Sequence, residues 1–90
     1  MLTHEHFERL SKAGYEYPAY GLTQDREGRI DEAELVNWLV PYIDQIMVPG
    51  EFNGRNKWII WHNTSSSIEH EDFSEILVMA VESIMEIERA

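Results

Sequence analysis

The 90-residue chain is predicted to form an α-rich α+β fold, as a single domain over residues 1–90. Two observations predict this class. Three segments carry apolar residues at helical spacing behind good N-caps. A short run of strand-forming residues lies between the second and third of these segments. The chain has no cysteine, so its one small core must be held together by packing alone.

The first main helix is predicted over residues 3–13. Thr3 is a good N-cap, because its hydroxyl can accept from the backbone amides of the first turn. Leu2 and Phe7 stand at the positions of a hydrophobic staple, and Gly14 favours the left-handed conformation that ends helices. The following residues 17–24 lack helical periodicity and are predicted to supply part of a small β element.

The second main helix is predicted over residues 31–47. Asp31 is its N-cap, with Glu34 completing a capping-box pattern. Apolar residues then recur at three- and four-residue spacing along one face. They are Leu35, Trp38, Leu39, Tyr42, Ile43 and Ile46. Because Pro41 cannot donate a helical hydrogen bond, we expect a kink there or a break into two shorter helices.

The second β segment is predicted over residues 57–63, and the third helix over 68–88. Residues 57–63 are rich in strand formers, with Trp58 on one face and Trp61 on the other. Ser67 is the predicted N-cap of the third helix. A long apolar stripe then continues to the end of that helix.

The formal net charge of −10 limits the classes of partner. So negative a chain repels phosphate backbones and anionic membranes, which argues against direct binding of nucleic acid or membrane and favours a basic protein partner. The longest apolar run, residues 76–81, is too short to span a membrane, and no basic signal region is recognised. We therefore expect a cytoplasmic protein.

Residues 23–35 carry acids and a glycine at nearly the spacing of an EF-hand loop. With Gly28 at the sixth position, the metal ligands would come from four acids, which are Asp25, Glu27, Asp31 and Glu34. The segment thus resembles the calcium-binding loop of EF-hand proteins, and the resemblance implies calcium as a ligand. Thr23 replaces the aspartate that opens such loops. The competing interpretation is that these acids surround a helix start.

Histidines and serines supply weaker alternatives for a site. Four histidines are available to a transition metal, but His4 and His6 are two residues apart and point to different sides of a helix. Ser65–Ser67 with His62 and His70 give the residue types of nucleophilic catalysis without a nucleophile-elbow pattern. We therefore predict no enzyme activity and no cofactor.

A row of acids on the third predicted helix is the main candidate for a binding surface. The row has four- and seven-residue spacing and consists of Glu71, Glu75, Glu82 and Glu86, with Met79 in its midst. Trp58, Trp61 and Met79 are candidate apolar anchors beside it.

The sequence therefore predicts a small acidic binding protein that inhibits or modulates a partner with a basic surface. Immunity proteins and phage anti-defence inhibitors are comparable in size and charge, and the partner could be a nucleic-acid-binding protein whose ligand the acids mimic. One alternative is a degenerate EF-hand-like calcium module. Another is a structural or assembly subunit that forms a homo-oligomer.

Overall fold

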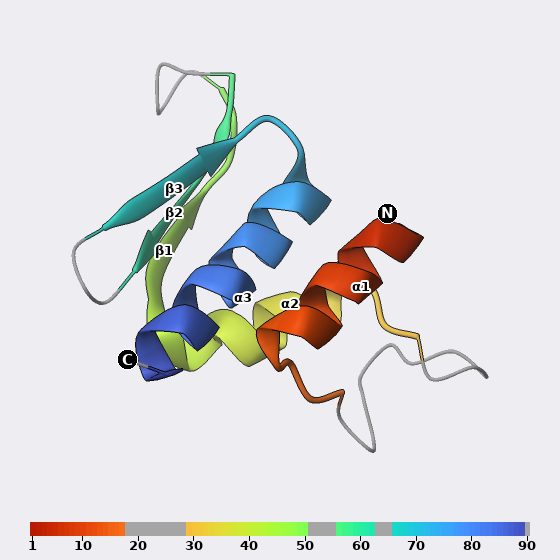
Figure 1. The fold of residues 1–90 in the computed structure, drawn as a ribbon. Helices are drawn as coiled ribbons and strands as arrows, with labels where there is room; N and C mark the ends of the chain where they lie inside the picture. Colours follow the sequence, from red (N-terminus) through yellow and green to blue (C-terminus); the bar gives the residue numbers. More distant parts are fainter. Residues whose placement is uncertain (18–28, 51–55, 63–65, 90) are drawn as a thin grey trace.

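A computed structural model describes residues 1–17, 29–50, 56–62 and 66–89 of the chain. Within these ranges it contains three α-helices, one 3₁₀ helix and a three-stranded antiparallel sheet (Figure 1). The predicted α+β class is confirmed. None of the described helices is both long enough and apolar enough to cross a membrane.

Helix α1 spans His4–Ala13 and matches the prediction. Thr3 is its N-cap and belongs to a capping box in which His6 is the second member. At the other end, Gly14 adopts a left-handed conformation with φ of 92°, which only glycine accepts readily. Local signals determine both ends of this helix.

Helix α2 spans Glu32–Leu39, so the prediction of one helix to residue 47 is wrong beyond Pro41. Asp31 is the N-cap, as predicted, and its carboxylate accepts from the amide of Ala33. A 3₁₀ helix, η1 (Val40–Tyr42), follows, with the proline in its first turn, where it needs no hydrogen-bond donor. Strand β1 then spans Ile43–Met47, so the chain changes from helix to strand within one 3₁₀ turn.

Strand β2 spans Trp58–His62 and confirms the predicted β segment at 57–63. It lies in the centre of the sheet, between β1 and β3. The β1–β2 register shifts between Ile43 and Gln45, where one extra residue interrupts the pairing. The other predicted β segment, 17–24, lies outside the described residues except for Tyr17, which is not in a strand.

Strand β3 spans Ser67–His70, where the prediction placed the start of the third helix. Helix α3 instead spans Phe73–Arg89. Its first turn is capped by Asp72, whose carboxylate accepts from the backbone amide of Glu75 at 2.8 Å. Ser67 was therefore wrongly assigned as the cap. It pairs with Trp61 of β2 instead.

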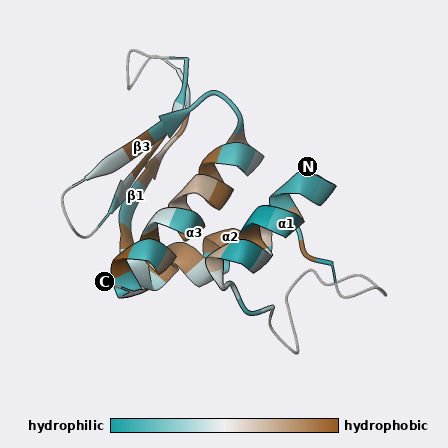
Figure 2. Ribbon diagram, viewed as in Figure 1, coloured by the Kyte–Doolittle hydropathy of each residue, from teal (hydrophilic) through white to brown (hydrophobic). Residues whose placement is uncertain are grey.

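The helices lie on one side of the sheet, with α3 against its strands (Figure 1). Figure 2 shows that α1 is mostly hydrophilic, whereas hydrophobic segments lie in α2, α3 and the sheet. The core is a single cluster of buried residues from all three helices and the sheet, and its centre is fully buried. The fully buried residues include Leu10, Leu35, Leu39, Ile60, Ile76, Leu77 and Val81. Hydrophobic packing between α3 and its neighbours thus holds the fold together.

Candidate functional site

The predicted acidic row is largely paired within the molecule. Arg9 of α1 points to α3, where its guanidinium lies 2.7 Å from the carboxylate of Glu75 and also donates to that of Glu82. His6, which lies in α1 like Arg9, also contacts Glu75. We call His6, Arg9, Glu75 and Glu82 the α1–α3 polar cluster. Two of the four predicted acids, Glu75 and Glu82, are therefore engaged in contacts between α1 and α3.

The charges of this cluster stabilise one another. Burial opposes ionisation of Glu75, but hydrogen bonds from Arg9 and His6 outweigh it and keep its pKa below the usual value. The hydrogen bond to Glu82 is the main reason that the pKa of Arg9 is raised. Glu75 and Arg9 therefore both stay charged at neutral pH, and their ion pair joins α1 to α3.

The other residues of the predicted row are scattered. Glu71 is exposed in the bend before α3, so it does not belong to the helix on which the row was placed. Met79 is half-buried, and Glu86 is exposed. The structure therefore does not bring the row together as one free acidic surface.

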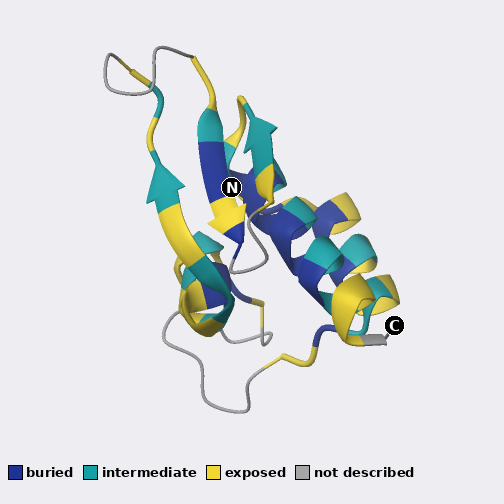
Figure 3. Ribbon diagram, turned by 90° about the vertical axis from the view of Figure 1, so that its left-hand side faces the viewer, coloured by how far each residue is buried: buried dark blue, intermediate teal, exposed yellow. Residues whose placement is uncertain are grey.

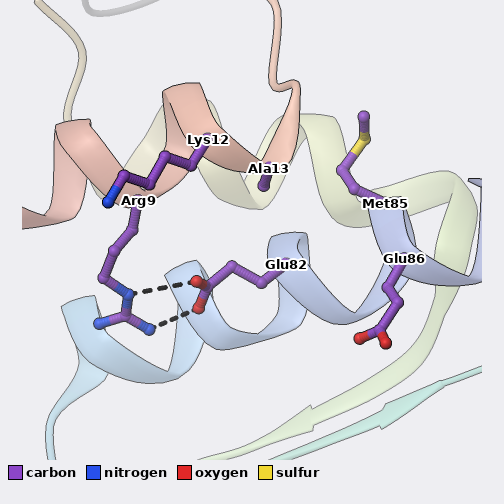
Figure 4. A pocket seen from close by; sticks show the side chains of 6 residues that line it. All are labelled: Arg9, Lys12, Ala13, Glu82, Met85 and Glu86. Atoms are coloured by element: carbon purple, nitrogen blue, oxygen red, sulfur yellow. Dashed lines mark hydrogen bonds and ion pairs between the residues drawn. The ribbon is translucent and has the colours of Figure 1, made fainter.

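A groove of about 370 Å³ lies beside the cluster, between α1 and α3 (Figure 4). Arg9 and Lys12 line it from α1, and Glu82 and Glu86 line it from α3. Its two positive and two negative charges balance, and its six lining residues include no histidine, serine or cysteine. The ion pair between Arg9 and Glu82 crosses the groove, which fits a structural contact better than a reaction centre.

The two predicted tryptophan anchors lie on opposite faces of the sheet. Trp58 faces α3, and its ring centroid lies 4.3 Å from that of Phe73. Trp61 points to the other side and is 39% exposed. The alternation predicted for this strand is therefore confirmed, and it separates a structural tryptophan from an exposed one.

The face around Trp61 is a second candidate surface. Strand pairing places six side chains on it, which are Gln45, Met47, Ile59, Trp61, Ser67 and Glu69. We call these residues the open sheet face, because no described helix covers it (Figures 1 and 3). Ile59 is only 7% exposed, yet it is not part of the main core cluster.

The histidines and serines form no catalytic arrangement among the described residues. His62 faces the inner side of the sheet and Ser67 the outer side. His70 uses Nδ1 to accept from the amide of Asp72. His62 is 2% exposed, and burial lowers its pKa. Its Nε2 atom has no hydrogen-bond partner in the described part of the chain.

The EF-hand interpretation can be examined at two of its four acids. Asp31 acts as a helix cap, and Glu34 is buried in α2 at 3% exposure. Asp25 and Glu27 lie outside the described residues. Within residues 1–17, 29–50, 56–62 and 66–89, no group of three or more histidine or acidic side chains is arranged to hold a metal ion.

Sequence reasoning overlooked Arg9 and gave His6 no role beyond a metal ligand. Both lie on the side of α1 that packs against α3, at a spacing of three residues. That spacing was the available signal, because Arg9 and Lys12 are the helix's two arginine or lysine residues. Comparisons of the chain with family models, curated proteins and solved structures find no match.

Proposed function

We propose that this protein is a small acidic, non-enzymatic binding protein that acts in the cytoplasm on a partner with a basic surface. One observation carries the proposal, namely the open sheet face, on whose central strand Trp61 is exposed. Ile59 is the next residue of β2 on that face, and Met47 lies opposite Ile59 on β1. Exposed aromatic side chains beside buried apolar ones are typical of the anchors in protein interfaces.

The charge of the chain indicates the chemistry of the partner. At −10, the protein attracts a basic surface and repels a second copy of itself. Glu69 of β3 lies on the open sheet face, and exposed Asp44 lies in β1 at the opposite edge of the sheet. Lysine or arginine side chains around an apolar patch of the partner would complement this arrangement. A nucleic-acid-binding protein would provide such a surface.

The contacts of α1 with α3 change the role that we assign to the acids in and just before α3. Glu75 and Glu82 hold Arg9, so reversing their charges would damage the fold as well as any interface. Exposed Glu71 and Glu86 are better suited to long-range attraction, which speeds association without close contact. Under this proposal Trp61 supplies the residence time of the complex, and the exposed acids supply its association rate.

The proposal is tested by comparing Trp61→Ser with a matched control. Val40→Ser is suitable, because Val40 is also an exposed apolar residue but lies in η1. Proteins captured from the native host on immobilised wild type would be identified by mass spectrometry, and the partner would be purified. Calorimetry should then show affinity reduced by about 30-fold or more in Trp61→Ser, as for an interface hot spot.

Two results would contradict the proposal. One is that folded Trp61→Ser binds the partner with the affinity of wild type, while the affinity of Val40→Ser is reduced. The other is affinity that does not fall with added salt, since attraction between exposed charges is screened. Sedimentation of the protein alone tests the assembly-subunit alternative, which predicts a homo-oligomer dissociated by Trp61→Ser.

A further inference from the structure

His6 joins the start of α1 to α3 through both nitrogens of its ring. Its Nδ1 atom accepts from the backbone amide of Thr3 at 3.0 Å. Its Nε2 atom lies 3.2 Å from Oε1 of Glu75. The residue is 7% exposed, so these two contacts replace water at both nitrogens. One imidazole thus completes the capping box with Thr3 and also links α1 to α3.

The partners of His6 determine which nitrogen carries the proton. A backbone amide can only donate, so Nδ1 must present its lone pair to Thr3. An ionised carboxylate can only accept, so the proton of the neutral ring must be on Nε2, directed at Glu75. The neutral ring therefore satisfies both contacts in one tautomer.

A second proton would break one of these contacts and keep the other. It would have to bind Nδ1, where it would face the N–H group of Thr3, donor against donor. The cap bond from Thr3 would then be lost. The hydrogen bond from Nε2 to Glu75 would persist and gain the attraction of opposite charges.

The charges around the ring determine whether this protonation is tolerated. The groups that face it are Glu75 of α3 and, across the same carboxylate, Arg9 of α1. Glu82 of α3 contacts Arg9 from the other side. With a neutral ring the α1–α3 polar cluster carries one net negative charge, so an imidazolium would neutralise it rather than add repulsion.

We propose that His6 is a proton-operated latch on the first turn of α1. The neutral ring caps the helix, and protonation at Nδ1 releases this turn while α1 remains attached to α3. The usual capping-box residue at this position is glutamate or glutamine, whose side chain does not change charge near neutral pH. Histidine makes the same cap responsive to acid.

The experiment follows amide hydrogen exchange by NMR between about pH 8 and about pH 5, corrected for the intrinsic pH dependence of exchange. Thr3, His6 and Phe7 report on the cap, because their amides make its hydrogen bonds. In wild type, their protection should fall about five- to tenfold on acidification, as for loss of a helix cap. Protection at Val78 in α3 should fall less, which separates this local release from unfolding of the whole chain.

His6→Gln and His4→Gln form a matched pair of variants. Glutamine at position 6 can accept from Thr3 and does not titrate, so His6→Gln should keep the cap protected at both pH values. His4 is exposed on the surface of α1, and its ring lies 3.0 Å from the carboxylate of Glu8, one turn along the same helix. His4→Gln should therefore retain the wild-type response.

Two outcomes would overturn the latch. The first is an equal loss of cap protection in wild type and His6→Gln, or no loss in wild type. The second needs no variant. If nitrogen chemical shifts of the His6 ring at about pH 8 place its proton on Nδ1 instead of Nε2, the tautomer on which the latch depends is absent.

Discussion

The two faces of strand β2 carry similar side chains but lie in different surroundings. Trp58, Ile60 and His62 point to the side occupied by α3, where Ile60 is completely buried. Ile59 and Trp61 point to the open sheet face. A strand that is apolar on both sides is usual where both sides are covered. Because the described helices cover only one side here, the second apolar face is the one on which the proposed binding depends.

Truncation of the two isoleucines should give the largest difference between the faces. Ile60→Ala would leave a cavity in the main core, and we expect the free energy of unfolding to fall by roughly 2–5 kcal/mol. Ile59→Ala should cost about half as much, because neighbouring groups outside the core can close around it. Urea unfolding of both variants measures this. Equal losses would mean that both faces belong to one core.

Substitution of the two tryptophans should give a smaller difference in stability and the opposite order in binding. Trp58→Ser removes the ring packed on Phe73, so the free energy of unfolding should fall by about 2–3 kcal/mol. Trp61→Ser should cost less than about 1 kcal/mol, because its ring is partly exposed. Thermal unfolding measures both values. A larger loss for Trp61→Ser would show that the open sheet face serves the fold.

His62 should make the inner face sensitive to pH, with the smallest effect of the three. Burial lowers its pKa below the ordinary value of 6.5, so the unfolded chain takes up a proton before the folded one does. Stability should therefore fall as the pH drops from about 6.5 toward the folded-state pKa. His62→Leu should remove this part of the pH dependence in urea unfolding, and His4→Gln is the control. An unchanged slope in His62→Leu would assign it to other groups.

Signals that lie within a few residues predicted the structure well. Thr3 and Gly14 correctly predicted the two ends of α1, and Asp31 correctly predicted the start of α2. The overlooked cap of α3 was of the same kind. Asp72 followed by Glu75 repeats the pattern that identified Asp31, but the apolar spacing before it suggested a helix that had already begun.

Pairing between distant segments could not be predicted in the same way. Ile43 and Ile46 continue the helical spacing of α2, yet they belong to strand β1, where they pair with residues of β2. Ile68 likewise fitted a helical stripe but pairs with Ile60. In segments of four or five residues, the periods of helix and strand are hard to distinguish, and strand partners decide between them.

The candidate surface was predicted in its residue types but not in its position. Trp61 was expected to be an anchor, and it is exposed. The acids were expected to lie free beside it, but Arg9, more than 60 residues away from them in sequence, binds two of them. Periodicity shows which side of a helix a residue occupies. It does not show which other helix lies there.

The register shift in β1 bears on how the protein behaves when crowded. An edge strand with regular backbone pairing is a template on which further strands can add, and many proteins aggregate by this route. In β1 the extra residue between Ile43 and Gln45 interrupts that template, and exposed Asp44 places a charge there. The interruption discourages the addition of a strand from another copy at the β1 edge of the sheet.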